Sequence, residues 1–220
     1  SIPEGVKTIL DVGSGSGGLA EKLVENNYEV ECVSPSSYLS DAIEQKLDSS
    51  VIVHRSTFES FDSQKKYDLI LFSESFQYVN IKKTLNKIPN IIKDKGQLLI
   101  CDFFRQPGTG TKPLGGGHDW EVFQKILGSY DFLQLKDIDI TKETARTYDL
   151  ISQILDEVAG PVKDLSAKYL NSHYPRGMKL LKWYFDKKIN RINRIYFSGN
   201  MTGEMFNKLK TYRILLYQIL

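Results

Sequence analysis

The first half of the chain alternates short apolar runs with amphipathic stretches. The apolar runs are rich in Val, Ile, Leu and Phe, which predicts strands at residues 6–12, 29–33, 51–54, 67–72 and 97–103. The intervening stretches repeat apolar residues at helical spacing, which predicts helices at residues 18–26, 38–47 and 81–92. Nearly continuous apolar strands that alternate with helices of this length indicate a parallel sheet covered on both faces.

A different pattern follows the fifth of these strands. Residues 107–117 are glycine-rich and too polar for a core, and residues 132–140 alternate as a strand. From residue 141 to about residue 200 the pattern is purely helical. Five helix starts are expected in this half. The N-terminal caps are Asp119, Thr141 and Thr202, and two further helices are expected to begin at Pro161 and Pro175. A closing strand is predicted at residues 212–219.

Together these elements predict an α/β fold. We expect a Rossmann-like, seven-stranded, mostly parallel sheet with helices on both faces and a helical cap inserted before the last strand. The expected divisions are an α/β core at residues 1–140, a helical cap at residues 141–201, and the closing helix and last core strand at residues 202–220.

The most informative string covers residues 9–18 and reads ILDVGSGSGG. It follows a predicted strand and opens a predicted helix, as a nucleotide-binding glycine turn does. Glycine lets the chain bend tightly and lets a ligand approach the backbone, while the helix N-terminus offers free N–H groups to an anion. Gly13, Gly15 and Gly18 also satisfy the spacing G-x-G-x-x-G, so a nicotinamide dinucleotide is one candidate ligand.

Two residues favour S-adenosylmethionine (SAM) over a dinucleotide. Asp11 lies two positions before Gly13, where a carboxylate attracts the ammonium group of SAM and repels a pyrophosphate. Ser34 stands at the end of the second strand, where a dinucleotide site usually has an acidic residue for the ribose.

Several strings resemble the class I SAM-dependent methyltransferases. They are ILDVGSGSG at residues 9–17, YDLILF at 67–72 and GQLLICD at 96–102. VSPS at 33–36 and SESFQYV at 73–79 are similar to the small-molecule members of the tocopherol, ubiquinone and sterol methyltransferase type. The resemblance covers residues 5–140 and the closing strand. It implies a SAM cofactor and methyl transfer to a small, hydrophobic or amphipathic acceptor.

The resemblance also implies where SAM binds. The expected cofactor-binding residues are Asp11, Gly13, Ser14, Gly15, Gly17, Ser34, Pro35, Thr57, Phe58 and Ser73. Of these, Asp11, Gly13 and Gly15 are expected to hold the methionine part, and Phe58 to contact the adenine. Ser34 and Thr57 depart from the family pattern, and the hydroxyl of Ser34 makes weaker hydrogen bonds than the usual carboxylate.

The methyl sulfonium is already a good electrophile, so the protein needs mainly alignment and a base. Open α/β sheets bind ligands beyond the carboxyl ends of their strands. Glu74 follows the fourth strand and His118 follows the glycine-rich stretch, so both are candidate catalytic bases. Tyr78 is a weaker candidate for orienting the acceptor, and the glycines at residues 115–117 predict a lid.

Composition narrows the classes of protein that remain. The 29 Lys and Arg nearly balance the 27 Asp and Glu, which excludes a globally basic nucleic-acid binder. Cys32 and Cys101 match no zinc or redox spacing, so we expect buried free thiols, no metal site and a cytoplasmic location. No apolar run approaches the ~20 residues that span a bilayer.

The charge is nevertheless uneven along the chain. Residues 163–194 hold nine Lys or Arg against Asp164 and Asp186. This basic stretch is either a solvated helix face or a contact for an acidic substrate or carrier, an anionic membrane, or RNA. Three functions therefore stay open: a small-molecule methyltransferase, which we favour; an RNA or protein methyltransferase that uses the basic helix 176–194; and a SAM-fold binding protein without catalysis.

Overall fold

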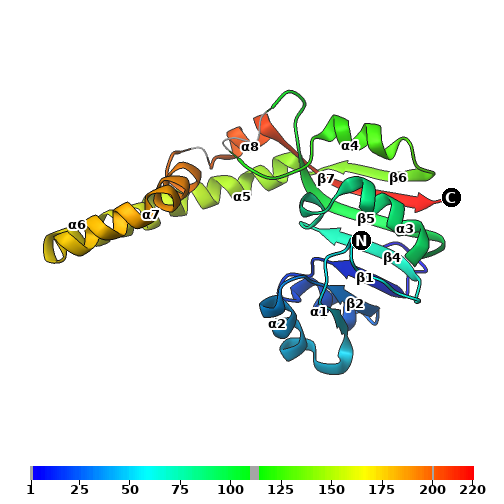
Figure 1. The fold of residues 1–220 in the computed structure, drawn as a ribbon. Helices are drawn as coiled ribbons and strands as arrows, with labels where there is room; N and C mark the ends of the chain where they lie inside the picture. Colours follow the sequence, from blue (N-terminus) through cyan, green and yellow to red (C-terminus); the bar gives the residue numbers. More distant parts are fainter. Residues whose placement is uncertain (1, 110–113, 200) are drawn as a thin grey trace. The chain divides into compact units, whose positions relative to one another are not determined.

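A computed structural model gives the structure of the chain, and it describes residues 2–109, 114–199 and 201–220. Part of the glycine-rich stretch expected to form a lid, residues 110–113, therefore lies outside the described residues. The chain divides into two compact units (Figure 1). Unit 1 consists of Ser1–Pro107, Gly116–Asp139 and Tyr212–Leu220, and unit 2 consists of Gly108–Gly115 and Ile140–Thr211.

The described chain forms a seven-stranded sheet, nearly all of it in unit 1, with the order β3-β2-β1-β4-β5-β7-β6. The strands are β1 (Thr8–Val12), β2 (Glu29–Val33), β3 (Ile52–His54), β4 (Tyr67–Ser73), β5 (Ile92–Arg105), β6 (Phe132–Asp139) and β7 (Lys210–Ile219). The first five strands pair in parallel, and β6 pairs with β7 antiparallel. The expected mostly parallel sheet is confirmed.

Helices cover both faces of this sheet because successive side chains of each buried strand point to opposite sides. The helices of unit 1 are α1 (Gly18–Glu25), α2 (Ser37–Leu47), α3 (Ile81–Ile91) and α4 (Trp120–Leu127). On one face, Ile9 of β1 belongs to the same core cluster as Ile43 of α2. On the other face, its neighbour Leu10 shares a cluster with Leu85 of α3 and Phe123 of α4.

Unit 2 is mainly helical. Its helices are α5 (Thr141–Ile154), the π-helical segment η3 (Leu155–Ala159), α6 (Gly160–His173), α7 (Pro175–Tyr196) and α8 (Gly203–Leu209). They follow β6 and precede β7 in the chain, as the helical pattern predicts. Tyr148 of α5 stacks on Phe206 of α8 with ring centroids 4.3 Å apart. The ammonium group of Lys163, on α6, lies 4.1 Å from the centroid of the Phe197 ring, which follows α7.

Two of the five expected helix starts are confirmed as side-chain caps. The carboxylate of Asp119 accepts from the N–H of Val122, and the hydroxyl of Thr202 accepts from the N–H of Met205. The cap predicted at Thr141 is wrong, because Ile140 precedes the helix without a side-chain hydrogen bond. The hydroxyl of Thr141 lies instead 3.3 Å from the hydroxyl of Thr211.

Two other predicted boundaries also differ from the structure. Pro161 lies in the first turn of α6, as predicted, but this helix is not separate, because η3 joins α5 to α6 without a break. A local π-helical turn changes the hydrogen-bond register, which accommodates a proline that has no N–H to donate. The fifth strand starts at Ile92, which pairs with Tyr67, and not at Gln97 as predicted. The polar segment between Ile92 and Gln97 forms an irregularity in the pairing with β4. Lys95 has a φ of 60° within it.

Both cysteines are free thiols in the structure, with Cys32 buried and Cys101 half-buried. Among the helices of the described chain, none combines the length and the apolar composition that crossing a bilayer requires.

Candidate functional site

The turn between β1 and α1 has a backbone that only glycine adopts easily. Gly13, Gly15 and Gly17 have φ values of 76°, 56° and 81°, all in the left-handed region. The N–H of Gly13 donates to the carbonyl of Val33 at 2.8 Å, which ties the turn to the end of β2. A Cβ on Gly13 would lie 2.4 Å from the Cβ of Ser75, so this position also lacks room for any side chain.

The strand order reverses between β1 and β4, and open α/β sheets bind ligands beyond the carboxyl ends of the strands at such a point. The hydroxyl of Ser75, two residues after β4, donates to the carbonyl of Val12 at the end of β1. This bond holds the loops after the two strands together. A cavity of about 210 Å³ lies beside it, with Gly13 and Ser75 in its wall.

Four of the expected cofactor-binding residues line this cavity: Gly13, Pro35, Thr57 and Phe58. The rest of the lining is Val12, Val33, Glu59, Ser75, Tyr78 and Val79. Whole small-molecule sites usually enclose ~300–1,000 Å³, so this cavity is the size of one part of a larger ligand. Its aliphatic and aromatic walls suit a flat ring.

The other expected cofactor residues lie outside the cavity lining: Asp11, Ser14, Gly15, Gly17, Ser34 and Ser73. The hydroxyl of Ser14 donates to the carbonyl of Asp11 at 2.8 Å, within the glycine turn. Ser34 is buried, and its N–H donates to the carbonyl of His54 at 3.0 Å. Ser73 is the last residue of β4.

Asp11 is the buried carboxyl group beneath the glycine turn. Its residue is 1% exposed, and among the described residues its Oδ2 has no hydrogen-bond partner. Burial raises the pKa of Asp11 to about 6, and the neighbouring Ser14 hydroxyl offsets this only in part. A desolvated carboxylate without a donor is stabilised by a cation placed beside it. Asp11 therefore fits the ammonium group of an amino-acid ligand.

Glu74 follows β4 at the same edge of the sheet, and its side chain is exposed. Its φ is 55°, a conformation that costs energy for a residue with a side chain and is often found at functional sites. The Tyr212 hydroxyl donates to Oε1 of Glu74 at 3.0 Å. Burial is the largest cause of a raised pKa at Tyr212, so this phenol stays protonated and remains a donor at neutral pH.

Asp102 is a second buried carboxyl group in this region, and sequence reasoning missed it as a site residue. Its oxygens accept from the N–H of Gln77 at 3.0 Å, the side-chain amide of Gln77 at 3.3 Å and the N–H of Phe103 at 2.8 Å. Burial raises the pKa of Asp102 to about 6, and the charge of Glu74 adds to the effect. The signal in the sequence was an acidic residue within the apolar run LLICDFF.

His118 is held by the loop that follows β4. Its Nε2 lies 2.9 Å from the carbonyl oxygen of Phe76. Because a carbonyl only accepts, Nε2 carries the proton of the neutral imidazole and Nδ1 keeps the lone pair. Burial lowers the pKa of His118, so the ring is neutral at pH 7. Both candidate bases are thus fixed by neighbouring groups of unit 1: Glu74 by Tyr212, and His118 by Phe76.

Five lining residues were not expected from the sequence: Val12, Val33, Glu59, Ser75 and Val79. Val12 and Val33 end β1 and β2, which is the position where a parallel sheet presents ligand contacts. Their place at the ends of two predicted strands was the signal in the sequence that could have identified Val12 and Val33 as site residues. The role of Ser75 carried no such signal, since its hydrogen bond to Val12 joins residues far apart in the sequence.

Comparison with known proteins agrees with this geometry. Residues 2–196 match the family model described as a methyltransferase domain. Ubiquinone biosynthesis O-methyltransferases of Rickettsia bellii and Rickettsia conorii are 25% and 27% identical to the chain, each over 64% of its length. The alignments span 65% and 54% of these relatives, so the chain covers less than two thirds of their length.

Solved structures show the same fold. A mycolic acid cyclopropane synthase complexed with SAH has a TM-score of 0.69 at 16% identity, covering 97% of this chain and 79% of that one. Geranyl diphosphate C-methyltransferase from Streptomyces coelicolor has a TM-score of 0.66 at 14% identity, covering 97% and 71%. With the family model matching most of its length, the chain belongs to the methyltransferase domain family.

Proposed function

We propose that the chain transfers the methyl group of SAM to an oxygen or carbon atom of a small, hydrophobic or amphipathic acceptor. The observation that carries this proposal is the buried carboxyl group of Asp11 beneath a glycine turn, whose Oδ2 has no hydrogen-bond partner among the described residues, together with the cavity at the switch point of the sheet. The names of the relatives support both acceptor atoms, since they include an O-methyltransferase and a C-methyltransferase.

The residues of the site fit the parts of SAM. Val33, Pro35 and Phe58 provide apolar walls for the adenine ring. Gly13 lets the ligand approach the backbone, and Asp11 attracts the ammonium group of the methionine part. Ser34 directly follows β2 beside the lining residues Val33 and Pro35, and it is the candidate contact for the ribose.

When bound, SAM supplies an electrophilic methyl group. The chain then has to align the acceptor and take its proton where the acceptor loses one. Glu74 is the first candidate base, because its carboxylate is exposed at the carboxyl edge of the sheet and the Tyr212 hydroxyl fixes its orientation. His118 is the second, because it is neutral at pH 7 and therefore able to accept a proton.

Calorimetry with SAM tests the cofactor part of the proposal. We expect the wild type to bind and Asp11→Asn to lose most of the affinity, because the amide keeps the shape but not the charge. The control is Asp41→Asn, an exposed carboxylate on α2 that should leave affinity unchanged. Unchanged affinity in Asp11→Asn would overturn the placement of the ammonium group. If the wild type does not bind SAM at millimolar concentration, the proposed SAM-dependent activity is ruled out. The non-catalytic binding protein is then the remaining alternative for this fold.

Methyl transfer from labelled SAM tests the catalytic part, with a catechol as the oxygen acceptor and geranyl diphosphate as the carbon acceptor. If Glu74 is the base, Glu74→Gln should reduce kcat by about 10²–10⁴-fold while the Kd for SAM stays unchanged. His118→Gln gives the same readout for the second candidate, and the exposed Glu121→Gln on α4 is the matched control. Normal turnover in both variants would remove both residues from the mechanism.

A further inference from the structure

The helices α6 and α7 of unit 2 form a surface with an unusual charge. Residues 163–194, which contain most of both helices, hold nine Lys or Arg against two Asp. None of the residues of α6 or α7 is buried. The positive charge is therefore at the surface and accessible to a partner, whereas the remainder of the chain is negative, given the overall charge of +2.

The same surface exposes large apolar side chains. Leu165 on α6 is 70% exposed, and on α7 the exposed fractions are 66% for Leu180, 77% for Trp183 and 72% for Tyr184. Single exposed apolar residues are common and need no explanation. On α7, Leu180, Trp183 and Tyr184 are spaced three and four residues apart, so they share one face of a helix that buries none of its residues. A group of exposed apolar residues of this kind marks an interaction site.

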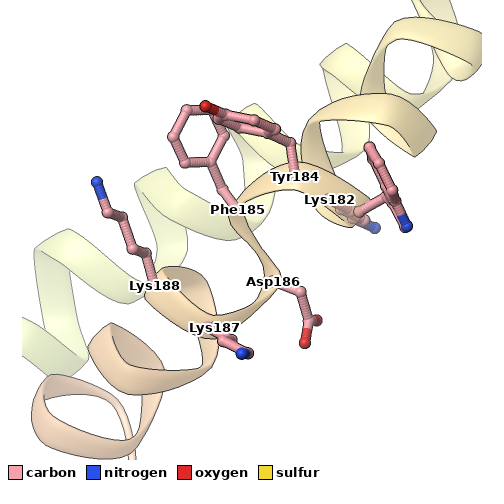
Figure 2. A pocket seen from close by; sticks show the side chains of 7 residues that line it. Lys182, Tyr184, Phe185, Asp186, Lys187 and Lys188 are labelled. Carbon is pink, nitrogen blue, oxygen red and sulfur yellow. The ribbon is translucent and has the colours of Figure 1, made fainter.

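Three consecutive aromatic residues of α7, at positions 183–185, lie between Lys182 and the lysines at 187 and 188. Residues 182–188 line a hollow in its surface, and Figure 2 shows the rings of Tyr184 and Phe185 lying together there. The two ring centroids are 4.7 Å apart in an edge-to-face arrangement. The ammonium group of Lys188 lies 5.7 Å from the centroid of the Phe185 ring. An aromatic ring beside a long cationic stem is typical of segments that lie at a membrane–water interface.

Charge and apolar exposure together select among three partners. A second copy of this surface would place two strongly positive faces against each other, which is repulsive. A nucleic acid matches the charge and can stack on the aromatic rings, but it offers little to Leu165 and Leu180. A bilayer with anionic headgroups attracts the Lys and Arg residues and accepts the apolar side chains below them.

We propose that the α6–α7 surface binds the face of an anionic lipid bilayer. The helices lie on the membrane, since none in the described chain is suited to span it. This proposal is independent of the proposed methyl transfer and needs neither SAM nor an acceptor.

Co-sedimentation of the full chain with vesicles tests this proposal. We expect binding to vesicles of phosphatidylglycerol and phosphatidylcholine, and much weaker binding to phosphatidylcholine alone. Trp120 and Trp183 are the two tryptophans of the chain, so Trp120→Phe leaves Trp183 as a reporter on α7. Its emission should shift to the blue when anionic vesicles are added, because the indole leaves water for the interface.

Two sets of variants separate charge from apolar contact. Reversing Lys187, Lys188, Arg191 and Arg194 to Glu should weaken vesicle binding by at least about a hundredfold. The matched control reverses Lys22, Lys82, Lys83 and Lys125, which are exposed lysines of unit 1, and should retain much more binding at the same net charge. Leu180→Ser with Trp183→Ser keeps the charge and should abolish the part of the binding that resists high salt.

Three outcomes would overturn the proposal. The first is absence of binding to anionic vesicles by the wild type. The second is an equal loss in the control set, which would mean that net charge alone matters. The third is binding without a shift of Trp183 emission, together with tighter, salt-sensitive retention of a single-stranded RNA, which would assign the surface to nucleic acid. Circular dichroism of each variant verifies that its helices are retained.

Discussion

The two units use similar aromatic side chains in opposite ways. In unit 1, Phe76 is fully buried, and its ring packs edge to face against Phe72 and Phe123, with centroids 5.3 and 5.4 Å away. In unit 2, Trp183 lies on a helix that buries none of its residues and is 77% exposed. Amphipathic spacing predicted helices in both units, but spacing alone does not say what covers the apolar side of a helix.

Because unit 1 buries its aromatic side chains and the α6–α7 surface of unit 2 exposes them, the two suit different kinds of partner. The candidate cofactor site of unit 1 is built on strands whose side chains are fixed from both faces of the sheet. Such a site holds its groups in defined positions, which alignment of a methyl donor requires. The α6–α7 surface has exposed side chains and a high positive charge, which suit a large and deformable partner such as a lipid surface.

The largest predicted effect comes from truncating the same type of side chain in each unit. Phe76→Ala should reduce the free energy of unfolding by about 3–5 kcal/mol, because it empties space among packed rings. Trp183→Ala should change it by less than about 0.5 kcal/mol, because the indole is mostly in water. Urea denaturation followed by circular dichroism, which reports on the helices of both units, measures both variants. Comparable losses would show that Trp183 is buried against something in solution.

A second prediction contrasts two glycines within the site of unit 1. Gly13→Ala and Gly15→Ala both place a side chain in the left-handed region, at a cost of about 1–2 kcal/mol each. Only at Gly13 does the new Cβ also collide with Ser75, whereas nothing lies within 4 Å at Gly15. Gly13→Ala should therefore lower Tm more and weaken SAM binding more than Gly15→Ala.

The collision itself can be tested by adding Ser75→Gly to Gly13→Ala. This second substitution removes the side chain that the new Cβ meets, so part of the lost Tm should return. If the double variant is no more stable than Gly13→Ala, contact with Ser75 is not the cause of the loss.

Most of the fold of unit 1 could be predicted from the sequence, because its signals are local. Apolar runs marked the strands of unit 1, and polar residues before apolar-periodic stretches marked the caps at Asp119 in unit 1 and at Thr202 in unit 2. Thr141 carried the same signal, yet its hydroxyl lies beside Thr211, from a distant part of the chain. Local sequence does not reveal such a competing partner.

Only part of the candidate site was predicted, again because some of its signals are local and others depend on distant parts of the chain. The glycine turn and Phe58 could be identified from one short string each. Ser75 and Asp102 could not, because their significance arises from bonds to residues on other loops and strands. The catalytic roles of Glu74 and His118 stay predictions.

The third prediction concerns pH and Asp11. In the free protein this carboxyl has a pKa of about 6, so the fraction able to attract an ammonium group falls below that pH. The affinity for SAM should therefore fall about tenfold for each pH unit below 6. Stability has the opposite sign: the folded pKa exceeds the ordinary value of 3.8, so the contribution of Asp11 to stability is lost as pH rises between these values.

Calorimetry and urea denaturation at pH 4 to 7 measure the two effects of Asp11. Asp11→Asn removes the titrating group, so the difference between variant and wild type isolates it from Asp102, which titrates in the same range. An unchanged affinity for SAM across this range in the wild type would mean that the charge of Asp11 does not contribute to binding.

The smallest predicted effect compares one acidic residue in each unit. Asp119→Ala removes the carboxylate that caps α4 and should cost about 1 kcal/mol, because the N–H of Val122 loses its partner. Asp186→Ala removes an exposed carboxylate within α7 and should change stability by less than about 0.5 kcal/mol. Both substitutions change the net charge equally, so a difference in Tm reports the cap. Equal shifts would mean that the hydrogen bond from the N–H of Val122 to Asp119 adds nothing measurable to stability.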